Sequence, residues 1–167
     1  MSGEPDVQEP GGILIEPDVL VDIRAAAAAA YPNEGCGALL GRREAAPFVS
    51  ATVPLSNSEK GTPRVRFSVS PRDYMSVERE ADRRGLELLG FWHSHPDHPA
   101  RPSATDRAFA WEGLLTLIVS VRQGEAGEVG AFQIAGPDAP FTEIEIFGKT
   151  GTVRPGDPAP TTDHGGT

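Results

Sequence analysis

The sequence predicts a single α/β or α+β domain in which helices pack against one β-sheet. Three segments with helical periodicity alternate along the chain with some seven short apolar segments that are typical of strands. The length of 167 residues is enough for one compact core and too small for two domains of ordinary size. The sequence contains no internal repeat, so we expect one sheet built from unlike elements.

The first half of the chain predicts a strand, a helix and a pair of strands. Residues 13–15 form a short strand candidate, and Pro17 suits the first turn of a helix. Tyr31, which precedes a proline, ends that helix. Two apolar segments, 36–41 and 48–55, then predict strands joined by a polar turn. The apolar stripe of the helix consists of Leu20, Ile23, Ala27 and Ala30.

The second half predicts two helices among four strands. Ser70 caps a helix that has a proline in its first turn, and Gly85 suits the end of that helix. A third helix is expected from Ser103 to Glu112, closed by Gly113. The strands are expected at 86–95, 114–121, 129–134 and 141–147, of which 114–121 is apolar enough to be a central strand.

The two ends of the chain differ from its middle. Residues 1–12 and 151–167 are rich in proline and glycine and have almost nothing apolar, so both are predicted to be disordered tails of a domain over 13–150. The net charge of −9 disfavours a nucleic acid partner. No apolar run reaches the roughly 18 residues of a membrane span, and no signal peptide is recognisable. With Cys36 as the single cysteine, we expect a cytoplasmic protein.

The segment around two histidines carries the clearest chemical signal. If residues 86–95 are extended, His93 and His95 lie on the same face with Cα atoms about 6.6 Å apart, and Ser94 points the other way. A proline follows directly and places the pair at a strand end, where sites are commonly built. Zinc then needs a third protein ligand and an open position for water, and the next candidate is Asp106.

Each of these residues also has an ordinary structural explanation. A His-x-His pair often fills polar surface or core, and Ser103 with Asp106 forms a helix capping box without any catalysis. His98 is a rival ligand, although it does not follow the alternation that places His93 and His95 on one face of the strand. Three features occur together: two histidines on one strand face, a loop bounded by prolines, and Ser and Asp at the start of a helix. Their combination favours a metal site.

The spacing His-Ser-His, seven residues, Ser, two residues, Asp resembles the zinc signature of the JAMM (MPN+) metalloproteases. Segment 31–41 resembles the part of this family that carries an upstream glutamate, which makes Glu34 its counterpart. Residues 54–57, 66–67 and 70–71 also resemble the small prokaryotic members. The resemblance covers about 13–147. It implies one MPN/JAMM domain with a curved mixed sheet flanked by helices, a fold related to that of cytidine deaminases.

The resemblance also implies a role for each matched residue. His93, His95 and Asp106 would hold one Zn²⁺, Glu34 would act as general base, and Ser103 would donate a hydrogen bond to the oxyanion. One conflict remains, because a Ser103 hydroxyl that caps its own helix is less free to serve the oxyanion.

The implied substrate is the C-terminal Gly-Gly of a ubiquitin-like β-grasp protein. The small prokaryotic relatives are associated with sulfur carriers of the ThiS/MoaD type, from which they release a C-terminal extension, a bound cysteine or a conjugated protein. The candidate insertion 56–66 is short, which favours such a carrier over ubiquitin chains. The carrier, the type of bond and the oligomeric state stay open.

Two other functions stay open beside the zinc peptidase. Cys36 would be the nucleophile of a thiol hydrolase that uses a histidine as its base. Alternatively, the domain is a non-catalytic scaffold of the same fold, although such scaffolds usually lose part of the ligand set. A zinc deaminase is set aside because the sequence has no Pro-Cys-x-x-Cys.

Overall fold

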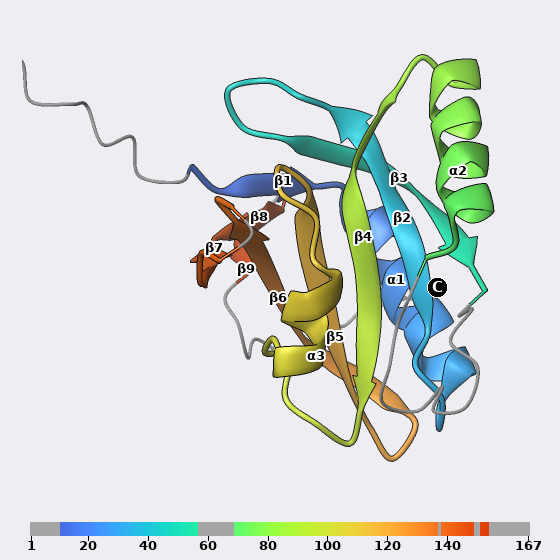
Figure 1. Ribbon diagram of the computed structural model, residues 1–167. Coiled ribbons are helices and arrows are strands. Elements are labelled where there is room, and N and C mark those ends of the chain that lie inside the picture. The colour runs from blue at the N-terminus through green and yellow to red at the C-terminus, as the bar shows by residue number, and fades with distance from the viewer. Residues whose placement is uncertain (1–10, 57–68, 137, 149–150, 154–167) are drawn as a thin grey trace, which may run out of the picture.

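The computed structural model describes residues 11–56, 69–136, 138–148 and 151–153. Within these residues, nine strands form one mixed sheet in the order β7-β6-β5-β4-β2-β3-β1-β8-β9 (Figure 1). The elements are β1 (Ile13–Ile15), α1 (Pro17–Ala30), β2 (Cys36–Arg42), β3 (Phe48–Leu55), α2 (Pro71–Arg83), β4 (Glu87–Pro96), α3 (Ala104–Phe109), β5 (Leu115–Arg122), β6 (Glu125–Ile134), β7 (Phe141–Ile144), β8 (Ile146–Gly148) and β9 (Gly151–Val153). The predicted mixed sheet with flanking helices is confirmed.

The helices α1 and α2 cover opposite faces of the sheet (Figure 1). On one face, Ile23 of α1 packs with Leu39 and Trp92 of the central strands. On the other face, Val77 of α2 packs with Phe91. Neighbouring side chains of a strand point to opposite faces, so β4 sends Trp92 into one layer and Phe91 into the other. The residues that follow in β4 continue this alternation into the site.

Strand β4 has a different partner on each side. It runs antiparallel to β2, where Cys36 pairs with His93. It runs parallel to β5, where His93 pairs with Ile118 and His95 with Ser120. The strand ends at Pro96, as the sequence predicts. Both histidines therefore belong to a strand that is fixed by hydrogen bonds on two sides.

The third helix is shorter than predicted. It ends at Phe109 instead of Glu112, because Ala110 is extended, with φ −72° and ψ 144°. Beyond it, Trp111 stacks on Tyr74 of α2, with ring centroids 5.1 Å apart. Trp111 makes this contact from the segment that follows the helix. The glycine expected to close the helix does adopt a left-handed conformation, with φ +78° at Gly113, but it closes a turn outside the helix.

The C-terminal strands also differ from the prediction. Segment 141–147 is divided into β7, which pairs with β6, and β8, which pairs with β1. Just beyond the expected C-terminal boundary at residue 150, β9 pairs with β8. Backbone pairing fixes these three residues although the segment around them is poor in apolar side chains.

Several expectations lie outside the described residues. These include the conformation of most of the N-terminal tail, of 154–167 and of nearly all of the candidate insertion 56–66. Among the described helices, none has the length and apolar character needed to cross a membrane.

Candidate metal centre

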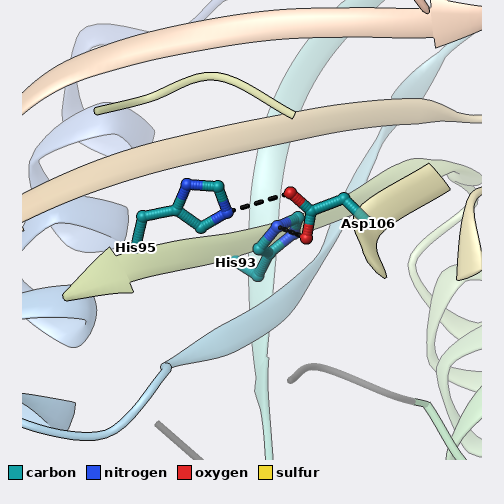
Figure 2. Close-up of side chains that lie close together, drawn as sticks. All are labelled: His93, His95 and Asp106. Atoms are coloured by element: carbon teal, nitrogen blue, oxygen red, sulfur yellow. Dashed lines mark hydrogen bonds and ion pairs between the residues drawn. The ribbon is translucent and has the colours of Figure 1, made fainter. Parts of the chain in front are cut away.

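Strand β4 and helix α3 bring three of the predicted site residues together. His93 and His95 project from the same face of β4, and Asp106 comes from the first turn of α3 (Figure 2). The distance from Nε2 of His93 to Oδ1 of Asp106 is 2.9 Å, and that from Nε2 of His95 to Oδ2 is 3.0 Å. The three ligand atoms lie within 4.8 Å of one another. Two imidazole nitrogens and a carboxylate oxygen are a donor set that suits zinc.

All three side chains are buried, with exposed fractions of 3%, 9% and 6% for His93, His95 and Asp106. Burial raises the pKa of Asp106, but the hydrogen bonds from the two histidines outweigh it and hold the pKa below its usual value. For His93, burial dominates over Asp106 and lowers the pKa. The site thus favours an ionised carboxylate and a neutral His93, which are the metal-binding forms of both groups.

Helix capping orients the Asp106 carboxylate toward the histidines. The backbone N–H of Ser103 donates to Oδ2 of Asp106 at 2.7 Å, and the N–H of Asp106 donates to the Ser103 hydroxyl at 3.1 Å. This is the reciprocal capping box that the sequence predicts. The structural and the metal-binding explanations of Asp106 are therefore compatible, because the cap holds the carboxylate where a metal would need it.

Both ring nitrogens of His95 have partners. The two contacts together indicate that the ring is protonated at both nitrogens in the metal-free protein. Nδ1 lies 2.9 Å from the carbonyl oxygen of Pro99, which can only accept, so Nδ1 carries the proton. Nε2 can then donate to Asp106 only if the ring is fully protonated. Burial opposes that state, but Asp106 outweighs it and raises the pKa of His95. A metal bound at Nε2 would replace this proton, and Pro99 would hold the required tautomer.

The loop between β4 and α3 is fixed at several points. The hydroxyl of Ser120 donates to the carbonyl oxygen of His98 at 2.6 Å, and Ala100 is buried against β5 and β6. The hydroxyl of Tyr31, at the end of α1, donates to the Asp97 carboxylate at 2.8 Å. His98 lines the cleft but is not part of the metal-ligand cluster found among the described residues. The rival ligand assignment is therefore not supported.

Glu34 lies between α1 and β2 and lines the same cleft as His95 and Ser103. The cleft has a volume of about 380 Å³. The residue is 5% exposed, and its Oε2 has no hydrogen-bond partner within the described parts of the chain. Burial raises the pKa of Glu34 to about 8, with His95 lowering it and Asp106 raising it. A buried carboxyl that gains and loses a proton near neutral pH is suited to general base catalysis.

The buried Glu34 carboxyl also predicts a pH-dependent stability for the metal-free protein. The unfolded carboxyl ionises near pH 4.5 and the folded one only near pH 8, so the folded state binds more protons between these values. Its stability therefore falls as the pH rises. We expect the Glu34→Gln variant to lack this fall and to gain on the wild type by up to about 4 kcal/mol between pH 5 and pH 8. Denaturant unfolding at the two pH values measures the gain, and an equal fall in both proteins would contradict it.

The Ser103 hydroxyl has capacity for both predicted roles. As helix cap it accepts a hydrogen bond from the N–H of Asp106, which uses one of its lone pairs. A hydroxyl has one donor and two acceptor positions, so its O–H is left to donate toward the cleft. Ser103 is exposed and lines the cleft beside Glu34. Helix capping and hydrogen bonding to an oxyanion are therefore compatible roles for the Ser103 hydroxyl.

Cys36 is placed as a structural residue. It is 3% exposed at the start of β2, and its thiol donates to the carbonyl oxygen of Leu55 at 3.4 Å. Burial, followed by the charge of Glu34, raises the pKa of Cys36 to about 12. The thiol therefore stays protonated at neutral pH, which makes it a poor nucleophile.

We accordingly expect the Cys36→Ser variant to keep activity within about threefold of the wild type, because serine preserves a donor for Leu55 and the thiolate is not used. Steady-state kinetics checks this, with circular dichroism as the control for folding. A folded, zinc-containing variant that had lost activity would instead favour the thiol hydrolase.

Two contacts of the site carry no signal in the sequence. One is the carbonyl oxygen of Pro99, which holds the tautomer of His95. The other is the pair of hydrogen bonds between Ser94 and Gly35, next to Glu34. The Pro99 oxygen is a backbone atom, which every residue type offers, and the partner of the Ser94 hydroxyl is set by the pairing of segments that are distant in the sequence.

Known proteins resemble this chain in sequence. The family described as prokaryotic homologs of the JAB domain matches residues 16–135. A desampylase of Haloferax volcanii is 39% identical over 103 residues, which are 61% of this chain and 73% of that protein. A probable TtuB-protein conjugate cleaving protease of Thermus thermophilus is 33% identical over 102 residues, which are 58% of this chain and 66% of that protein.

Solved structures resemble it in fold. A protein of Desulfitobacterium hafniense, solved in solution, is 34% identical with a TM-score of 0.73, and the match covers 82% of this chain and 92% of that one. A JAB1/MPN domain protein of Archaeoglobus fulgidus is 19% identical with a TM-score of 0.51, over 80% of this chain and 95% of that one, and it supports the fold alone. The family match spans most of the described domain and includes Glu34, His93, His95 and Asp106. This chain therefore belongs to the family of prokaryotic homologs of the JAB domain.

Proposed function

We propose that this protein is a zinc-dependent isopeptidase that cleaves after the C-terminal Gly-Gly of a ubiquitin-like carrier protein. The observation that carries the proposal is a buried carboxyl, Glu34, that lines the same cleft as His95, one member of a cluster of two histidines and an aspartate. The names of the relatives support the substrate class, since one is a desampylase and another a protease for protein conjugates. We further propose a cytoplasmic location, which suits a chain with one unpaired thiol.

The burial of the metal-ligand cluster supports a Gly-Gly substrate. As whole residues, His93 and His95 are 2% and 7% exposed, so a scissile carbonyl has to come close to buried side chains to reach a metal that they hold. A chain segment without side chains can approach a buried site more closely than any other. We propose a β-grasp carrier of the ThiS/MoaD type as the partner, because such a carrier ends in a Gly-Gly tail whose terminal carbonyl is joined to the target protein or to the extension.

Each site residue then has a defined task. His93, His95 and Asp106 would hold the zinc ion, which would supply Lewis acidity and would lower the pKa of a bound water toward about 7. Glu34 takes the proton of the attacking water at its carboxylate and delivers it to the leaving amine. Ser103 donates its O–H to the oxyanion that develops on the substrate carbonyl.

The Ser103→Ala variant is expected to lower kcat by about 10²–10³-fold with zinc retained, because the oxyanion loses a donor. The change also removes a helix cap. Ser70→Ala is the matched control, since the Ser70 hydroxyl accepts from the N–H of Asp73 at the same 3.1 Å, at the start of α2. Steady-state kinetics should show the loss in Ser103→Ala alone. Equal rates in both variants would leave Ser103 with only its capping role.

A direct assay tests the function itself. The substrates are a β-grasp carrier ending in Gly-Gly, joined either to a lysine side chain of a target protein or to a linear extension. We expect zinc-loaded protein to release the carrier with a free Gly-Gly end, a chelator to stop the reaction, and added zinc to restore it. Zinc-loaded protein that cleaves neither conjugate would contradict the proposal and favour the scaffold.

A further inference from the structure

We propose that Ser94, the residue between the two histidines, is a positioning residue that fixes the backbone of Glu34 through its neighbour Gly35. Ser94 is fully buried, at 0% exposed. Its hydroxyl accepts a hydrogen bond from the Gly35 N–H at 2.8 Å, and its own N–H donates to the Gly35 carbonyl oxygen at 3.0 Å. The inference concerns the same site as the proposed function and rests on it for the role of Glu34.

The strand register explains why this pair controls Glu34. Strands β2 and β4 are antiparallel, with Cys36 opposite His93. One step further, two hydrogen bonds join Gly35 to Ser94, and Glu34 is the residue directly before Gly35. Glu34 is therefore held relative to the metal ligands by the last contact before β2 separates from β4.

The hydrogen bonds between Ser94 and Gly35 differ from those of a regular antiparallel pair. In a hydrogen-bonded pair of a regular antiparallel ladder, each residue donates its N–H to the backbone carbonyl of the other. Here the Ser94 N–H follows this rule, whereas the Gly35 N–H donates to the Ser94 hydroxyl. The side chain thus acts as the acceptor at the point where the chain turns from α1 into β2, and no other atom of residue 94 does this.

Gly35 is closely packed on the side where a Cβ atom would lie. A Cβ atom at this position would lie 3.0 Å from Cβ of Ala30 and 3.4 Å from the ring of Trp92. The backbone is therefore enclosed between α1 and β4, with the Ser94 hydroxyl as the partner of its N–H. Without the hydroxyl, a buried donor would lose its partner, and the backbone would shift to satisfy it.

A shift at Gly35 would move the carboxyl of the adjacent Glu34. Its Oε2 has no hydrogen-bond partner among the described residues, so no such bond holds that oxygen in place. A misplacement of about 1 Å can lower a catalysed rate by about 10²-fold. The Ser94 hydroxyl thus connects the base to the strand that carries the metal ligands, through a single hydrogen bond.

The Ser94→Ala variant tests this with two readouts. In the metal-free protein, hydrogen exchange at the Gly35 amide, followed by NMR, should accelerate at least about tenfold relative to the wild type. In the zinc-loaded enzyme, kcat should fall about 10–100-fold while KM stays within threefold and the zinc content stays near one per chain. Ser94→Thr, which keeps the hydroxyl, should restore both values toward those of the wild type.

Ser70→Ala is again the matched control, because it removes a hydroxyl that accepts a backbone N–H far from the site. It should change neither Gly35 exchange nor kcat. If Ser94→Ala does not fold, Ser94→Cys offers a weaker acceptor and should show intermediate values of both readouts. Unchanged Gly35 exchange in the folded variant, or unchanged kcat, overturns the inference. Failure of the wild type to cleave any conjugate is separate, since it would overturn the proposed function while exchange still reports on the hydrogen bond.

Discussion

The Glu34→Gln variant is expected to lose activity by about 10³-fold or more in kcat, within the range that a general base contributes. Glutamine has the same shape and fits the same buried position, but it cannot take a proton from water at neutral pH. The zinc content and KM should stay close to those of the wild type, because Glu34 is outside the metal-ligand cluster found in the described chain. Steady-state kinetics on a Gly-Gly conjugate, together with metal analysis, measures these quantities.

Two further glutamate variants test whether the loss of kcat is specific to the position of the Glu34 carboxylate. Glu34→Asp keeps a carboxyl but withdraws it by one methylene, so its kcat should lie between those of the wild type and Glu34→Gln. Glu44→Gln removes an exposed carboxyl between β2 and β3 and should leave kcat unchanged. If Glu34→Gln kept wild-type kcat, the proton would have to be taken by another group and the assignment of the base would be wrong.

The His95→Ala variant is expected to lose both zinc and activity. His95 supplies one of the two imidazole ligands, and its removal also leaves the Asp106 carboxylate buried with one of its two histidine partners missing. Zinc sites with a vacant coordination position hold the metal through three protein ligands, so two ligands should not retain it through gel filtration. Metal analysis of the purified protein should fall from near one zinc per chain to near none.

His98→Ala is the matched control for this loss. His98 lies three residues further along and lines the same cleft, but its ring is not in the metal-ligand cluster of the described residues. It should keep its zinc. A His95→Ala protein that still contained one zinc, or an equal loss in His98→Ala, would show that the ligands are assigned wrongly.

The two histidines were predictable from sequence because the signal is local. Strand parity places His93 and His95 on one face whatever the rest of the chain does, and Pro96 fixes the end of the strand. The capping box of α3 is equally local, since Ser103 and Asp106 are three residues apart. The structure confirms both features, and it adds that the cap and the metal-ligand cluster use the same carboxylate.

The features that the residues alone did not predict depend on contacts between distant parts of the chain. Nothing around Glu34 distinguishes it from a solvated glutamate, and only the family resemblance indicated its role. It lines the same cleft as His95 because the pairing of β2 with β4 brings the start of β2 beside the histidines. The early end of α3 at Phe109 has the same kind of origin, because Trp111 stacks on Tyr74 of another helix. So does the separation of β8 from β7, since β8 pairs with the first strand of the chain.

Anomalous diffraction at the zinc edge, from crystals of the zinc-loaded protein, tests the central claim most directly. We predict one peak, at about 2.0–2.2 Å from Nε2 of His93, Nε2 of His95 and a carboxylate oxygen of Asp106. The Glu34 carboxyl should lie beyond this distance, within reach of a water on the metal. A peak elsewhere in the molecule, no peak at all, or Glu34 bound directly to the zinc would contradict the account.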